Sequence, residues 1–124
     1  MEKIFLDANV LIDIVEERRD VDLAQFKNYK LFISPLSIHV LTYLYKYVMP
    51  DEKLADLKQV FTFIPFDKLI TNDALLGPTA DFEDNVQLHS AANGDCNYFL
   101  TRDKKLLDMK FFGKTKIVKS LEQN

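Results

Sequence analysis

Short apolar runs alternate with longer stretches of helical periodicity along this chain. Between the runs, apolar side chains recur at helical spacing, as in Val10, Leu11, Ile14 and Val15. Consecutive parallel strands need long crossover connections, usually helical, so this alternation predicts βαβ units with helices on both faces of a parallel sheet. We expect an α/β fold with three layers, α/β/α, around a central parallel sheet, formed by a single domain over residues 1–124. The expected strands are Lys3–Leu6, Leu31–Ile33, Phe63–Phe66, Tyr98–Thr101 and Lys116–Val118.

Polar caps and helix breakers set the expected helix boundaries. Asp81 and Gly94 are placed to begin and end a helix over Phe82–Asn93. The segment Leu36–Val48 is apolar almost all round, which predicts a buried helix. The other expected helices are a segment through Val15, a short helix capped by Asp20 or Asp22 and ending at Phe26, Leu54–Phe61, Asp67–Leu76 and Lys104–Met109.

Composition excludes several classes of protein. The 124 residues fit one domain, and a single Cys96 excludes a disulfide framework and a CxxC metal site. Asp7 and Asp13 interrupt the N-terminal apolar stretch, so we expect neither a signal peptide nor a membrane span there. We therefore expect a cytoplasmic protein that does not bind a membrane.

The charge is unevenly distributed along the chain. The net charge of −3 argues against binding duplex nucleic acid by bulk charge alone. Residues 1–101 carry 9 Lys and Arg against 16 Asp and Glu, whereas residues 102–119 carry 7 against 2. This basic stretch is either a solvated lysine-rich surface or a means of holding an anion near acidic residues.

Acidic residues follow two of the expected strands. Asp7 comes directly after Lys3–Leu6, and Asp103 comes just after Tyr98–Thr101. Ligands of open α/β sheets bind beyond the carboxyl ends of the strands. A third acidic group, made up of Asp81, Glu83 and Asp84, opens the helix that precedes the Tyr98–Thr101 strand. Because that helix also starts at the carboxyl edge, we expect these carboxylates to converge.

Two interpretations of these carboxylates stay open. Asp7, Asp81 and Asp103 are each placed to cap a helix, which needs no ligand. Alternatively, the clustered carboxylates hold a cation that offsets their mutual repulsion. An oxygen-only ligand set favours Mg²⁺ or Mn²⁺ over Zn²⁺. Such an ion activates water and stabilises a phosphoryl transition state.

Three motifs resemble those of PIN domains, in the same order and with similar spacing. They are Phe5-Leu6-Asp7-Ala8-Asn9-Val10-Leu11, Asp81-Phe82-Glu83-Asp84-Asn85-Val86-Gln87 and Tyr98-Phe99-Leu100-Thr101-Arg102-Asp103. The resemblance covers nearly the whole chain. It implies a PIN-like α/β/α fold and an Mg²⁺- or Mn²⁺-dependent endoribonuclease, as in the VapC-type toxins of toxin–antitoxin pairs. It also implies an RNA substrate, an antitoxin protein as partner and a homodimer.

The resemblance assigns roles residue by residue. Asp7, Asp84 and Asp103 match the metal-binding, catalytic positions of the family. Val40 stands where the family usually has a glutamate, and Glu83 could supply a replacement carboxylate. The supporting residues are Asn9, which would orient Asp7, and Thr101, which would bond a metal-bound water.

Other interpretations remain beside a PIN nuclease. Arg102, Lys104 and Lys105 would contact the RNA backbone of a nuclease. Because Val40 lacks a carboxylate, the chain could instead be a PIN-like RNA-binding or regulatory domain with a weakened or inactive metal site. The segment Asp7-Ala8-Asn9-Val10 also resembles the DxDx[TV] opening of haloacid dehalogenase-type phosphatases. That chemistry needs an acid where Asn9 stands, and no later lysine motif supports it.

Overall fold

The computed structural model describes residues 1–121, which contain a sheet of six strands in the order β3-β2-β1-β4-β6-β5. The strands are β1 (Lys3–Leu6), β2 (Lys30–Ile33), β3 (Phe61–Phe63), β4 (Tyr98–Leu100), β5 (Phe111–Phe112) and β6 (Thr115–Val118). Neighbouring strands are parallel except β5 and β6, which are antiparallel. The predicted α/β fold with a mostly parallel sheet is confirmed.

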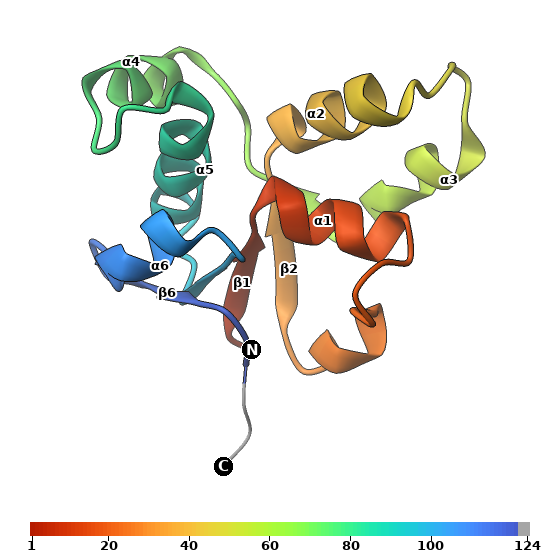
Figure 1. Ribbon diagram of the computed structural model, residues 1–124, viewed down its shortest axis with the longest axis horizontal. Helices are drawn as coiled ribbons and strands as arrows, with labels where there is room; N and C mark the ends of the chain where they lie inside the picture. The colour runs from red at the N-terminus through yellow and green to blue at the C-terminus, as the bar shows by residue number, and fades with distance from the viewer. Residues whose placement is uncertain (122–124) are drawn as a thin grey trace.

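Helices cover both faces of the sheet. Figure 1 shows α1, α2 and α3 on one side of the strands, and α4, α5 and α6 on the other. The helices are α1 (Ala8–Val15), α2 (Pro35–Tyr45), α3 (Glu52–Ala55), α4 (Lys68–Leu76), α5 (Phe82–Asn93) and α6 (Lys104–Met109). Two 3₁₀ helices, η1 (Leu23–Phe26) and η2 (Asp56–Gln59), lie in the connections.

Alternation along β1 divides the core between the two faces. Ile4 and Leu6 point to the side of α1 and α2, where they belong to one apolar cluster with Leu11 and Leu41. Phe5, between them, belongs to the cluster under α5 and α6 and stacks on Phe99 with ring centroids 5.6 Å apart. This period of two is the one expected of a strand buried on both faces.

The prediction of a buried helix over Leu36–Val48 is wrong. Helix α2 ends at Tyr45, only Ser37 and Leu41 are buried along it, and Tyr43, Leu44 and Tyr45 are exposed. Helix α2 packs on α1 along one stripe, and a helix that rests on a neighbour in this way leaves its other sides in solvent. The apolar composition of α2 therefore produces an exposed apolar surface.

The chain between residues 50 and 66 also differs from the prediction. In place of a helix over Leu54–Phe61, α3 and η2 end before β3, which pairs in parallel with β2. The strand expected at Phe63–Phe66 is therefore displaced to Phe61–Phe63. Pro65 carries no N–H for a sheet ladder, so the strand is confined to the residues before it. Strand β5 was not expected at all.

Candidate active site at the carboxyl edge of the sheet

Asp7 stands at the end of β1 and caps α1. Its Oδ1 accepts a hydrogen bond from the Ala8 backbone N–H at 2.8 Å, and its Oδ2 accepts one from Thr101 Oγ1 at 2.7 Å. The side chain is buried, and this burial raises the pKa of Asp7 to about 6 despite the two hydrogen bonds. The charges of Glu83 and Asp103 raise it further. Asp7 therefore caps a helix at a position where burial disfavours its charged form.

Thr101 joins the ends of β1 and β4. Its buried hydroxyl donates to Asp7 and accepts the Asp103 backbone N–H at 3.0 Å. Asp103 in turn caps α6, because its Oδ1 accepts the Lys105 backbone N–H at 2.9 Å. One hydroxyl thus fixes Asp103 relative to Asp7, which lies 96 positions earlier in the sequence.

The first turn of α5 supplies the third acidic group. Asp81 caps this helix by accepting the Asp84 backbone N–H at 2.9 Å, whereas the side chains of Glu83 and Asp84 cap nothing. Partial burial, followed by the charges of Asp81, Asp7 and Asp103, raises the pKa of Asp84 to about 7. Burial and the charge of Asp81 also raise the pKa of Glu83. The mutual effect of these charges places the carboxylates that follow β1 and β4 within electrostatic range of those in the first turn of α5.

The structure thus supports capping by Asp7, Asp81 and Asp103 and also their expected convergence. Within residues 1–121, however, no group of three or more His, Cys, Asp or Glu side chains is arranged so that it could hold a metal ion. The carboxylates are within electrostatic range of one another without forming a closed ligand cage.

Asn9 adds an unexpected feature beside Asp7. Its Nδ2 lies 3.4 Å from Asp7 Oδ2, which agrees with an orienting role. Its Oδ1 is buried and accepts no hydrogen bond. A buried polar atom without a partner costs roughly 1–3 kcal/mol and calls for an explanation.

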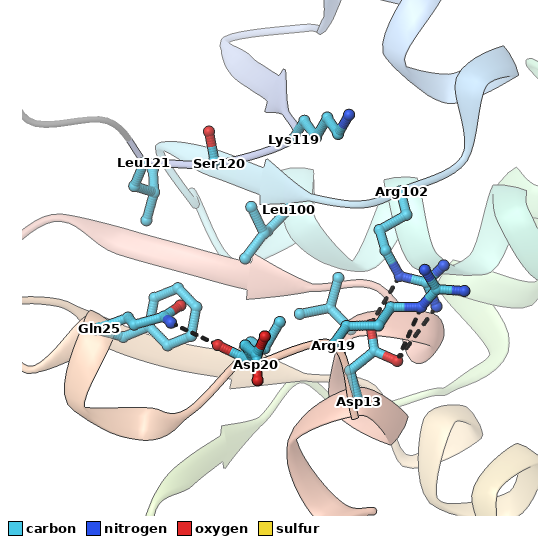
Figure 2. Close-up of a pocket in the computed structure, with 12 residues that line it drawn as sticks. Asp13, Arg19, Asp20, Gln25, Leu100, Arg102, Lys119, Ser120 and Leu121 are labelled. Atoms are coloured by element: carbon cyan, nitrogen blue, oxygen red, sulfur yellow. Dashed lines mark hydrogen bonds and ion pairs between the residues drawn. The ribbon is translucent and has the colours of Figure 1, made fainter. Parts of the chain in front are cut away.

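The expected RNA-contacting residues fall into two environments. Lys104 and Lys105 are exposed in the first turn of α6, next to Asp103. Arg102 instead donates from Nε to Asp13 Oδ2 at 2.7 Å and from Nη2 to Asp13 Oδ1 at 3.4 Å (Figure 2). Sequence reasoning missed this pairing of Asp13. The available signal was an acidic residue within the apolar stripe of α1.

Val40 is half-buried on α2 and packs against the apolar cluster under α1 and α2. It lies one helical turn after Ser37, whose hydroxyl meets the Gln87 side chain of α5 at 3.0 Å. Val40 therefore shares the face of α2 that carries this contact to α5, and its side chain supplies no oxygen there.

A PIN-domain profile matches residues 3–105, and the chain belongs to the PIN domain family. The fold resembles that in a crystal structure of VapBC2 from Rickettsia felis bound to a DNA fragment from their promoter, with 15% identity over 94% of this chain and 97% of that one and a TM-score of 0.65. It also resembles a structure of FitAB bound to the IR36 DNA fragment, with 14% identity over 93% of each chain and a TM-score of 0.53. A comparison with curated proteins gives no match. Among residues 1–121, no helix is long and apolar enough to cross a membrane.

Proposed function

We propose that this chain is an Mg²⁺- or Mn²⁺-dependent endoribonuclease that hydrolyses RNA phosphodiester bonds. The observation that carries this proposal is the mutual repulsion of Asp7, Asp84 and Asp103 at the carboxyl edge of the sheet. Every ion pair within residues 1–121 has Asp13 as its acid, so no basic side chain there neutralises these three carboxylates. A site that gathers uncompensated carboxylates in this way is a candidate for cation binding and catalysis.

The residues present fit a hard divalent cation in their donor chemistry. Asp7, Asp84 and Asp103 would hold the ion and Glu83 would add a fourth carboxylate, which together offer oxygen donors only. Because these side chains are not arranged as a metal site in residues 1–121, they would have to close on the ion as it binds. The unpartnered Oδ1 of Asn9 adds a further polar oxygen beside Asp7. When bound, the ion supplies a water of lowered pKa and stabilises the charge of a phosphoryl transition state.

The chain itself positions these groups before any substrate arrives. Thr101 and the Ala8 N–H fix both oxygens of Asp7, and the Asp81 cap fixes the turn that carries Asp84. Asp7 is thus held in place before any substrate binds, and a fixed charge of this kind needs no reorganisation during the reaction. Lys104 and Lys105 would bind the phosphates that flank the cleaved bond. Arg102 is less free to do so, because its guanidinium is shared with Asp13.

We also propose that the chain is the toxin of a toxin–antitoxin pair and forms a homodimer. Two separate groups of exposed apolar side chains support this proposal, one on α2, where Tyr43 is 75% exposed, and one on α4, where Leu75 is 69% and Leu76 90% exposed. Exposed apolar side chains in such number mark protein–protein contact sites. Resemblance of the fold to VapBC2 and FitAB favours the same class of assembly.

The activity is tested with purified protein and a set of structured and single-stranded RNAs. We expect cleavage in Mg²⁺ or Mn²⁺ and none in EDTA, with activity restored by added metal. Asp84→Asn is the matched inactive control, because Asp84 caps no helix and its replacement leaves α5 intact. Cleavage that persists in EDTA, or in Asp84→Asn, would contradict the proposed mechanism.

A second candidate function is an RNA-binding or regulatory PIN domain with an inactive metal site. Val40 favours it, because an apolar side chain replaces a carboxylate on α2. If the first proposal is correct, Val40→Glu raises Mn²⁺ affinity measured by calorimetry and lowers metal-free stability, since the new charge lies beside an apolar cluster. Val40→Gln is the control for the polar group alone. RNA binding without cleavage in both wild type and Val40→Glu would instead favour the regulatory domain.

A further inference from the structure

A cavity of about 620 Å³ lies on the α1 side of the sheet, between α1, η1 and the chain at the ends of β4 and β6 (Figure 2). Its apolar walls come from four separate segments. Val10 lies in α1, Phe26 in η1, Leu100 at the end of β4 and Leu121 after β6. The volume is within the usual range for sites that bind small molecules.

Cationic side chains line the same cavity. Arg102 and Arg19 approach it around the buried carboxylate of Asp13, and Lys119 lines it from the chain after β6. Arg18 also pairs with Asp13, at 3.6 Å. The guanidinium groups of Arg18, Arg19 and Arg102 thus all pair with the buried carboxylate of Asp13, and their summed positive charge exceeds its single negative charge. Among the charged side chains that line the cavity, Arg19, Arg102 and Lys119 outnumber Asp13 and Asp20, so the lining carries a net charge of +1 in a chain whose net charge is −3, which favours an anion.

The loop that leads from α1 to the cavity has an unusual backbone. Glu17, Arg19 and Asp20 all have positive φ angles, of 53°, 58° and 57°. Left-handed backbone costs a residue other than glycine roughly 1–2 kcal/mol. The pairing of Arg18 and Arg19 with Asp13 helps to hold this conformation. As a result, Arg19 and Asp20 both line the cavity.

Asp20 supplies an acceptor for a specific ligand. Among the described residues, its backbone carbonyl accepts from Gln25 but its carboxylate accepts no hydrogen bond and pairs with no cation. Asp20 is exposed and lines a cavity with apolar walls, and a free carboxylate in such a place suits a flat ring that carries two adjacent N–H donors. The Watson–Crick edge of guanine, with its ring N–H and amino group, has that pattern.

The cavity adjoins the carboxylate edge. Arg102 lies between Thr101, which bonds Asp7, and Asp103. Asp13 is six positions after Asp7 along α1, which corresponds to about 9 Å at the rise of an α-helix. An RNA strand bound at Asp7 has to extend only about this far to place a neighbouring nucleotide in the cavity, because Asp13 lines it.

We propose that this cavity binds one unpaired nucleotide of an RNA strand, preferably guanosine, next to the phosphate cleaved at the carboxyl edge. The base lies on the apolar walls with its Watson–Crick edge toward Asp20, and the phosphate is held by Arg19 and Lys119. Unpaired RNA bases are commonly recognised in this way, by burial against flat or guanidinium surfaces and by hydrogen bonds to the base edge. As a statement about substrate, the inference rests on the proposed function, but nucleotide binding itself does not.

Nucleotide binding is tested on the full chain in EDTA, so that no cleavage contributes. The four 5′-nucleoside monophosphates, guanosine and inorganic phosphate are titrated separately while backbone amide resonances are followed by NMR. We expect GMP to bind most tightly and to shift resonances around Arg19, Leu100 and Lys119. Lys119→Ala is expected to weaken GMP binding about threefold at low salt. The matched control is Lys114→Ala, an exposed lysine in the turn between β5 and β6 that does not line the cavity.

Asp20→Asn tests the base preference. We expect it to reduce the preference for GMP over AMP, because an amide presents one acceptor where the carboxylate presents two. Equal responses to GMP and inorganic phosphate would overturn the proposal in favour of a plain anion site. Resonance shifts confined to α6 would also overturn it, as would the absence of any shift.

Cleavage then links the cavity to the substrate. Leu121→Trp, which fills the cavity, is expected to abolish a guanosine preference beside the cut sites in a random single-stranded RNA pool. If wild type cleaves and Leu121→Trp cuts the same sites, this inference fails and the proposed function stands. If wild type cleaves no RNA in any metal, the proposed function fails, and the titrations decide nucleotide binding separately.

Discussion

At the scale of single residues, the candidate site carries charges that the fold does not stabilise. Asp7 is buried, and its pKa of about 6 means that the ionised form is disfavoured in the folded chain. Asp84 has a pKa of about 7 for the same reason, with added repulsion from its neighbours. Stability sacrificed at a few positions in this way is typical of sites under functional selection.

Replacement of Asp7 by asparagine is expected to change activity and stability in opposite directions. Asparagine caps helices as well as aspartate does and carries no charge to bury. We expect Asp7→Asn to abolish cleavage and, in metal-free buffer at pH 7, to raise the free energy of unfolding by about 2 kcal/mol. Urea denaturation in EDTA measures the stability. Asp22→Asn, at the exposed cap of η1, is the control and should change the stability by less than about 0.5 kcal/mol. A loss of stability in Asp7→Asn would contradict the cost assigned to the buried charge.

The raised pKa values also predict a pH dependence. A carboxyl group whose pKa is higher in the folded chain binds protons more tightly when folded, so its contribution to stability is lost as pH rises through that pKa. For Asp7 and Asp84 the loss falls between about pH 4 and pH 7. We expect wild type to lose more stability over this range in EDTA than Asp84→Asn does. Added Mn²⁺ should remove the difference. Parallel stability curves for the two proteins in EDTA would contradict the assigned coupling.

At the scale of elements, the features that local sequence signals determine could be predicted, whereas those that depend on tertiary packing could not. The bounds of α5 and α6 follow from sequence, because Asp81, Gly94 and Asp103 are clear boundary signals. Strand β5 has two residues, too few to show a periodic pattern in the sequence, and it exists as a strand only because it pairs with β6. The convergence of the acidic groups could be predicted from strand ends. The Asp13–Arg102 pair could not, because its partners are 89 positions apart and no local pattern links them.

Helices α2 and α5 are joined by a buried hydrogen bond between Ser37 and Gln87, so the loss of stability on mutating one of these residues should depend on whether the other is present. Gln87 is fully buried, and its Nε2 donates to Ser37 Oγ at 3.0 Å. Ser37→Ala leaves this amide unpaired and should destabilise the chain by about 1–3 kcal/mol. In the double variant Ser37→Ala/Gln87→Met both polar groups are gone, so most of that loss should be recovered. Chemical denaturation of the single and double variants measures the coupling. Additive losses would mean that the two side chains do not interact, and Thr42→Ala at an exposed hydroxyl controls for the substitution itself.

At the scale of the whole molecule, acidic and basic groups occupy different parts of the fold. The carboxylates gather at the ends of β1 and β4, where a cation would be needed before a polyanion could approach. The basic stretch over residues 102–119 begins directly after β4 and places Lys104 and Lys105 beside Asp103. This arrangement predicts that RNA is bound through a few local contacts, while the net charge of −3 disfavours binding elsewhere on the surface.

The salt dependence of RNA binding tests this arrangement. Each phosphate contact to single-stranded RNA contributes about −0.7 to the slope of log K against log salt concentration. If Lys104 and Lys105 each contact one phosphate, Lys104→Ala/Lys105→Ala should weaken binding and make the slope less negative by about 1.4. Fluorescence anisotropy of a labelled single-stranded RNA in EDTA measures both quantities without cleavage. Lys27→Ala/Lys30→Ala removes two exposed lysines at the opposite, amino edge of the sheet and should leave the slope unchanged. Equal slopes for wild type and both double variants would mean that Lys104 and Lys105 are solvated surface, and that RNA reaches the carboxylates by another path.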